Sequence, residues 1–187
     1  MGKWPTRDEA QQILDQWMKN KNLKKHAWAV EAAMRAYARK LGGDEERWAA
    51  VGLLHDFDYE KYPTLQDHPF KGVEFLRSQG YDGEFLSGVM AHAEHTHTPR
   101  NTPMEKAIFA VDELTGLIVA VALVRPSKKL ADVTVDSVRK KWNEKQFAAG
   151  VDRKSIEQGA AELGVSLDDH IATVLAAMQG ISDRLGL

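Results

Sequence analysis

The stretch AVGLLHDFDYEKYP, residues 50–63, is the point at which an ordinary apolar segment ends in polar residues. An apolar run over residues 51–54 leads directly into His55 and Asp56, and Asp58 follows two positions later. A helix that ends in solvent would explain these residues, because polar side chains suit an exposed helix terminus. A metal site would explain them as well, because imidazole nitrogens and carboxylate oxygens are metal ligands. The rest of the sequence has to distinguish an exposed helix end from a metal site.

The composition describes a chain with little net charge and no cysteine. With 187 residues, the chain is long enough for one domain with a sizeable hydrophobic core. The net charge of -2 predicts neither a nucleic-acid polymer nor an anionic membrane as a partner. The absence of cysteine excludes disulfides and thiolate chemistry and favours a cytoplasmic location. The charged first residues lack a secretory signal, and the longest apolar stretch, residues 114–124, is too short to span a bilayer.

Helix start and stop signals recur along the chain, and no run alternates with the period of a strand. Thr6 and Glu9 are spaced as a capping box that opens a first helix, and Thr102 followed by Pro103 opens a long one. The later helices are predicted over about 23–41, 44–54, 69–80, 82–92, 102–124, 134–143, 152–163 and 167–184. We therefore predict an all-α fold, a single-domain helical bundle over residues 1–187.

A carboxylate in a strongly apolar helix is the second unusual feature. Asp112 lies in MEKAIFAVDELTGLIVAVALV, residues 104–124, with apolar residues on both sides. A buried carboxylate is costly without a partner, so Asp112 needs an arginine, a lysine or a metal cation. His26, His68 and His92 each lie at the start or end of a predicted helix. Together with the doublet quoted above, these positions favour a metal site of nitrogen and oxygen ligands, which suits Fe, Mn, Ni, Co or Zn.

The order of these residues resembles the signature of a known family. His26, the doublet of His55 and Asp56, and Asp112 follow the order H…HD…D of the HD-domain superfamily of metal-dependent phosphohydrolases. The doublet stands in LLHDF, its usual setting in that family, and Asp112 stands in EKAIFAVDELTGLI. The resemblance covers about residues 22–124. It implies a helical HD-type domain, with the rest of the chain forming additional helices.

Two further histidines resemble those of the two-metal, HDIG-like subgroup. They are His68 in DHPFKGVEFL and His92 in GVMAHAEHT. The resemblance implies two divalent transition-metal ions with Asp56 as the bridge. The implied ligands are His26, His55, Asp56 and Asp112 for one ion, and Asp56, His68 and His92 for the other. His95 is either an added ligand or a solvated neighbour, and Asp58 departs from the small residue that often occupies that position in the subgroup.

The resemblance also implies hydrolysis of a phosphate ester, with a nucleotide or another small phosphorylated metabolite as the substrate. Two ions clamp a phosphoryl group and lower the pKa of a bridging water. Arg125 and Lys128, with Lys129, follow the metal-bearing helix and are candidates for binding the phosphate. An exposed basic helix end explains them equally well. Asp58 and Glu60 are candidates for orienting water or protonating the leaving group, with solvated loop acids as the alternative.

Two other functions stay open at this point. Some HD-domain proteins use a mixed-valence di-iron pair to activate dioxygen and oxidise an organophosphonate or a polyol, so an oxygenase is one alternative. A ligand-binding or regulatory helical domain without catalysis is the other. Residues 125–187 are expected to form additional helices, and a lid or a dimer face is equally compatible with them. The sequence therefore leaves a homodimer open.

Overall fold

The computed structural model describes residues 2–187, and its regular structure is helical apart from one isolated bridge between Lys3 and Tyr81. This confirms the predicted all-α fold. The α-helices are α1 (Arg7–Trp17), α2 (Lys21–Leu41), α3 (Glu45–Leu54), α4 (Phe70–Ser78), α5 (Gly83–Ala91), α6 (Pro103–Leu123), α7 (Val135–Trp142), α8 (Arg153–Glu162), α9 (Leu167–Gln179) and α10 (Ser182–Leu185). The short 3-10 turns are η1 (Glu94–Thr96) and η2 (Leu130–Asp132).

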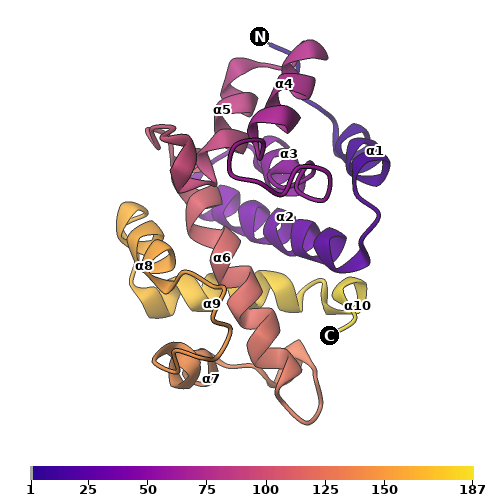
Figure 1. Cartoon of the computed structure of the whole chain (residues 1–187). Coiled ribbons are helices and arrows are strands. Elements are labelled where there is room, and N and C mark those ends of the chain that lie inside the picture. Colours follow the sequence, from indigo (N-terminus) through magenta and orange to yellow (C-terminus); the bar gives the residue numbers. More distant parts are fainter. Residues whose placement is uncertain (1) are drawn as a thin grey trace.

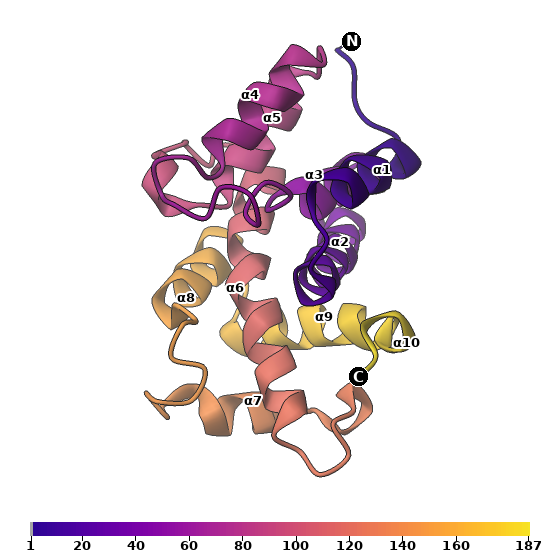
Figure 2. The ribbon, with the colours of Figure 1, turned by 45° about the vertical axis from the view of Figure 1, so that its right-hand side comes forward.

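Helix α6 runs through the middle of the molecule and connects two groups of helices (Figure 1). Helices α1, α3, α4 and α5 lie toward one end, and α7, α9 and α10 lie toward the other, as a second view confirms (Figure 2). Helix α2 packs against α3, α6 and α9, and α6 also packs against α5 and α8. The C-terminal ends of α3 and α5 therefore meet the first half of α6 beside α2.

The helix ends follow the local chemistry of the sequence. Thr6 and Thr102 each form a complete capping box, so both predicted helix starts are confirmed. Gly42 ends α2 with a φ of 73°, a left-handed conformation that glycine adopts without strain. The predicted helix over 167–184 is wrong in one respect, because the helix ends at Gln179 and a separate short helix follows.

The hydrophobic core connects the first and last helices of the chain. Buried apolar side chains form one cluster that runs from Ala10 in α1 to Leu185 in α10. The crossing of α6 and α8 is close because Gly159 has no side chain, and a Cβ added there would lie 2.5 Å from the Cα of Ala110. Among residues 2–187, no helix combines the length and the apolar character needed to cross a membrane.

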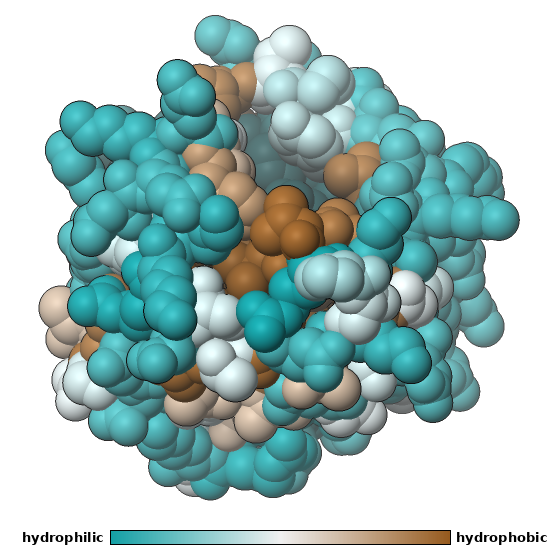
Figure 3. All heavy atoms as spheres, turned by 90° about the horizontal axis from the view of Figure 1, so that it is seen from below, coloured by the Kyte–Doolittle hydropathy of each residue, from teal (hydrophilic) through white to brown (hydrophobic). Residues whose placement is uncertain are grey.

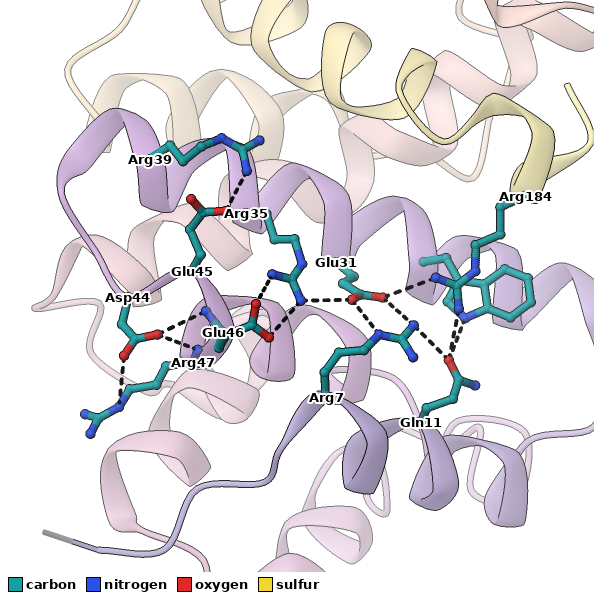
Figure 4. A network of polar contacts seen from close by, with 11 residues as sticks. Arg7, Gln11, Glu31, Arg35, Arg39, Asp44, Glu45, Glu46, Arg47 and Arg184 are labelled. Carbon is teal, nitrogen blue, oxygen red and sulfur yellow. Dashed lines mark hydrogen bonds and ion pairs between the residues drawn. The ribbon is translucent and has the colours of Figure 1, made fainter.

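A network of ion pairs joins the N-terminal helices to α10 (Figure 4). Glu31 of α2 is buried and accepts hydrogen bonds from the guanidinium of Arg7 in α1 at 3.0 and 3.1 Å. Arg184 of α10 approaches the same carboxylate at 3.9 Å and donates to Gln11 at 3.1 Å. Its guanidinium also lies 4.2 Å from the ring centroid of Trp28. Helix α10 is therefore held against α1 and α2.

Candidate metal centre

The candidate metal ligands come from five separate parts of the fold. His55 and His92 are the residues that end α3 and α5, at the points where both helices meet α6. The others are His26 in α2, Asp56 just after α3, His68 just before α4 and Asp112 in α6. The structure places these six residues in two adjacent groups that could each hold a metal ion. All except the fully buried His55 line one cavity of about 510 Å³.

The first group consists of His26, His55 and Asp112. The Nε2 atoms of His26 and His55 lie 3.2 Å apart. Oδ1 of Asp112 lies 3.0 Å from Nε2 of His26 and 3.4 Å from Nε2 of His55. Three ligand atoms from α2, α3 and α6 therefore point at one position between these helices.

The second group consists of Asp56, His68 and His92. Oδ1 of Asp56 lies 3.1 Å from Nε2 of His68 and 3.3 Å from Nε2 of His92, and these two nitrogens are 3.1 Å apart. The other oxygen, Oδ2, faces the first group at 3.5 Å from Nε2 of His55 and 3.7 Å from Nε2 of His26. Each oxygen of one carboxylate thus faces a different group, which is the placement expected of a bridging ligand.

The two histidines at helix ends are oriented by free backbone carbonyls. Nδ1 of His55 lies 2.7 Å from the carbonyl oxygen of Gly52, and Nδ1 of His92 lies 2.6 Å from that of Val89. Carbonyls in the last turn of a helix lack a partner within the helix, so they accept a hydrogen bond from these rings. Because a carbonyl can only accept, each Nδ1 carries a hydrogen, and Nε2 is the ring nitrogen that faces the other candidate ligands.

The other two histidines are oriented by side chains. Nδ1 of His68 donates to Oδ1 of Asp58 at 2.7 Å. Nδ1 of His26 lies 3.2 Å from the hydroxyl oxygen of Thr115, whose own hydrogen is donated to the carbonyl oxygen of Asp112 at 2.8 Å. Metal-bound histidines typically donate their second ring nitrogen to an acceptor in this way. All four histidines of the pocket therefore have the orientation of metal ligands.

The charges in the pocket shift the pKa values of its ionisable groups. Burial would lower the pKa of His55, but the carboxylates of Asp56 and Asp112 raise it well above its ordinary value. The pKa of His68 rises to about 9 against the effect of burial, because the ring nitrogens donate hydrogen bonds to the carboxylates of Asp56 and Asp58, which favour the charged ring. Burial opposes ionisation of Asp56 and Asp112, yet the neighbouring His55 holds both carboxyl pKa values below their ordinary range. The site therefore contains anionic carboxylates that require positive charge.

The donor set fits divalent transition metals. Four imidazole nitrogens and two carboxylates converge, and the chain contains no cysteine to add a sulfur ligand. Nitrogen and oxygen ligands of this kind suit Zn, Fe, Mn, Co or Ni. These residues therefore suit a pair of metal ions.

Asp58 does not lie in the pocket. Its side chain is 0% exposed and sits behind His68, with Oδ2 accepting a hydrogen bond from the backbone N–H of Gly72 at 2.8 Å. Gly72 has no side chain, and a Cβ there would lie 2.8 Å from the Asp58 carboxylate. The interpretation of Asp58 as a group that orients water or protonates the leaving group is therefore corrected, because it has no access to substrate. It positions His68 instead.

The basic residues after α6 are not brought to the metal pocket. Arg125 lines a different hollow between the end of α6 and α7, and Lys128 and Lys129 are exposed in the same loop. The hypothesis that Arg125 and Lys128 bind the substrate phosphate is therefore not supported by their positions. Glu60 also lies elsewhere, where it accepts hydrogen bonds from the backbone N–H groups before α2.

Other residues complete the wall of the pocket. His95 lines it and donates from Nε2 to the carbonyl oxygen of His68 at 2.8 Å. Glu113 also lines it and accepts a hydrogen bond from the backbone N–H of Asp152, the N-cap of α8, at 3.1 Å. Burial and the neighbouring Asp112 raise the pKa of Glu113. Asp112 and Glu113 could be singled out in the sequence because they interrupt an apolar helix. No sequence pattern predicted that Asp152 would lie near the metal ligands.

An all-helical protein that gathers four histidines and two aspartates from distant helices belongs to a class of helical metal-binding proteins. The family model of the HD domain matches residues 23–117, just over half of the chain. The chain therefore belongs to the HD domain family, whose superfamily is that of metal-dependent phosphohydrolases. No curated protein and no solved structure matches it. The family match does not test the resemblance to the HDIG-like subgroup, which stays a prediction.

Proposed function

We propose that the protein is a two-metal phosphohydrolase that hydrolyses a phosphate monoester of a small metabolite. The observation that carries this proposal is the division of Asp56 between two ligand groups, with one oxygen facing each. When bound, two such ions polarise a phosphoryl group and supply a water nucleophile at neutral pH. The chain contributes the fixed orientation of the four histidines, each through an acceptor for its Nδ1 hydrogen.

The proposed reaction adds one water molecule to the ester. A bond forms between the water oxygen and phosphorus while the ester bond between phosphorus and oxygen breaks. The departing alcohol takes up a proton, so that the products are the free alcohol and inorganic phosphate. No redox partner is required for this step.

The charges around the pocket support a single phosphate rather than a polyphosphate. Among the described residues, those that line the pocket include Glu94, Glu113 and Asp152 and neither lysine nor arginine. A second or third phosphate group outside the metal centre would meet carboxylates with no protein cation between them. A phosphate monoester carries its charge at one end, where the metal ions would meet it.

The test combines metal analysis with phosphate release. Protein purified without chelator and without a nickel column is expected to hold close to two ions per chain and to release phosphate from at least one monoester of a broad panel. His26→Ala and His68→Ala, one from each group, should each reduce the metal content to about one ion. His97→Asn is the matched control, because His97 is exposed, lies outside both groups and has a φ of 53°, which asparagine tolerates.

Two outcomes would contradict the proposal. A fully metal-loaded protein that hydrolyses no member of a panel of phosphate mono- and diesters would exclude the hydrolase. Iron in both groups together with oxygen consumption on an organophosphonate or a polyol would favour the di-iron oxygenase on the same scaffold.

A further inference from the structure

A second cavity lies on the other side of His26 from the metal pocket. It has a volume of about 330 Å³ and lies between the first turns of α2, the second half of α6 and the C-terminal residues around α10. Its apolar lining consists of Ala29, Val119, Leu123, Leu185 and Leu187. The lower half of the molecule, which contains the end of α6 and α10, has a hollow with a hydrophobic floor (Figure 3). None of these side chains contributes a ligand to the metal centre.

The two cavities meet at His26 and Gly116, which line both. His26 presents Nε2 to the metal pocket, while its Nδ1 faces Thr115 in the wall of the apolar cavity. Gly116 has no side chain, and a Cβ added there would have Val151 as its nearest neighbour at 3.9 Å, so the backbone at this position is not crowded. The two cavities are therefore neighbours that share the wall formed by His26 and Gly116.

The polar groups of the second cavity are few. The hydroxyl of Thr115 is already engaged with His26 and with the carbonyl of Asp112. Asn22 and Lys25 are the remaining polar side chains of the lining. A sugar or a nucleobase buried there would lose its hydrogen bonds to water with few replacements. An apolar group would gain free energy by leaving water.

The distance along α6 from Asp112 and the volume of the second cavity limit the size of a bound apolar group. Val119 and Leu123 follow Asp112 on α6 by seven and eleven residues. At a rise of about 1.5 Å per residue they lie about 10 and 16 Å from it along the helix axis. The cavity of about 330 Å³ holds about ten methylene-sized groups, if each occupies the ~30 Å³ of a water molecule.

The far wall of the cavity is fixed, and its mouth is open. Leu185 is buried, and the adjacent Arg184 is tied to Glu31 and Gln11 in the network of Figure 4. By contrast, Leu123 at the end of α6 is 48% exposed although it is a large apolar residue. Leu123 therefore belongs to the part of the cavity wall that faces solvent.

We propose that the substrate is the phosphate monoester of an apolar alcohol, whose phosphate lies at the metal centre and whose aliphatic or aromatic tail, of up to about ten carbons, occupies this second cavity. The phosphate end of this assignment rests on the proposed function. The tail end rests on the shape and lining of the second cavity, so the two parts can be tested separately.

Binding of n-alkylphosphonates to the metal-loaded full chain tests the assignment without catalysis. These compounds keep the phosphate-like head and cannot release phosphate by ester hydrolysis. Titration calorimetry from ethyl to octyl phosphonate is expected to show affinity that rises up to about fourfold for each added methylene. Equal affinity along the series would overturn the assignment, as would tighter binding of a nucleoside monophosphate than of octyl phosphonate.

Two pairs of variants locate the tail. Leu123→Gln should reduce the ratio of octyl to ethyl affinity by about fivefold, because an apolar contact is lost. Val124→Gln is its matched control, since Val124 is 60% exposed and lines a different hollow, and its ratio should equal that of the unmodified protein. Gly116→Leu should abolish the chain-length dependence by placing a bulky side chain where the two cavities adjoin, and Gly116→Ala should keep most of it. A chain-length dependence that survives Gly116→Leu and Leu123→Gln would place the tail elsewhere and overturn the assignment.

Failure of this inference differs from failure of the proposed function. Phosphate release from small monoesters with no preference for longer tails would overturn the inference and leave the hydrolase intact. Chain-length-dependent phosphonate binding with no hydrolysis of the matching alkyl phosphate would retain the tail site and overturn the hydrolase.

Discussion

Two buried regions of the molecule use histidine in opposite ways. His170 of α9 accepts a hydrogen bond from the hydroxyl of Tyr37 on one ring nitrogen and donates to the carbonyl of Ala110 from the other at 2.8 Å. His55 and His92 each donate from Nδ1 to a carbonyl of their own helix and direct Nε2 toward other candidate metal ligands. The difference shows that burial alone does not mark a functional histidine. The mark is a buried ring nitrogen directed at other metal ligands.

The two regions also differ in charge. Burial away from any carboxylate partner lowers the pKa of His170 to about 4, so the ring is neutral. In the metal pocket, carboxylates raise the pKa of His68 to about 9 although burial opposes the charge. One region is therefore a closed structural contact, and the other is a set of anionic and nitrogen ligands suited to cations. Variants in each region should separate effects on stability from effects on metal binding.

The largest expected effect is that of Asp56→Ala. Removing the carboxylate whose two oxygens face the two groups should lower metal content below one ion per chain and reduce phosphate release by about a thousandfold or more, since metal ions contribute several kcal/mol of transition-state stabilisation. Metal analysis and initial rates measure both. An Asp56→Ala protein that keeps two ions and its full rate would contradict the assignment of this pocket as a metal site and, with it, the contrast with the structural contact of His170.

The next largest effect is the part of the free energy of unfolding that His170 contributes at neutral pH and that is lost in acid. Its unfolded pKa is near 6.5, so below that pH the unfolded chain binds a proton that the folded ring excludes. The contribution of His170 is therefore complete above pH 6.5 and falls as the pH drops toward 4, by about 3 kcal/mol. Chemical denaturation of the unmodified protein and of His170→Gln across this range measures it. The difference in unfolding free energy between them should shrink in acid, while metal content at neutral pH stays the same.

The sequence predicted the helices well because their ends are decided locally. Thr6, Asp44 and Thr102 cap helices through hydrogen bonds to backbone groups two or three residues away. The error after α9 also has a local origin, because the predicted helix is interrupted at Gly180 and Ile181. Nearby residues set these features, so they can be read from a single stretch of chain.

The candidate ligands could be named from the sequence because each stands where a polar residue is unusual, and because their order resembles a family signature. The role of Asp58 could not be predicted, since it depends on His68 ten residues later and on the backbone of Gly72. The acidic wall at Asp152 depends on α8 returning to α6, which no local pattern specifies. Contacts between distant segments are the part of the site that the sequence leaves open.

A smaller effect is expected for Asp58→Asn. Asparagine keeps the size of the side chain but places an N–H₂ group against either His68 or the N–H of Gly72, so one donor loses its acceptor. Loss of such an orienting partner weakens metal binding by about 10- to 100-fold. Metal titration against a competing chelator measures this change. Glu60→Gln is the control, because Glu60 accepts from the backbone before α2 and should leave metal affinity unaltered.

The smallest effect should come from Thr115→Val, which removes the acceptor of His26 without changing the shape of the side chain. At 3.2 Å this hydrogen bond is the longest of the four that orient the pocket histidines, and its acceptor is neutral. A neutral hydrogen bond contributes about 1 kcal/mol, so the ion at His26 should bind about fivefold more weakly. Thr115→Ser restores the hydroxyl and should restore the affinity. Because Asp58 acts on the other group, the double variant Asp58→Asn with Thr115→Val should show separate losses at the two ions, and a single shared loss would mean that the groups do not hold distinct ions.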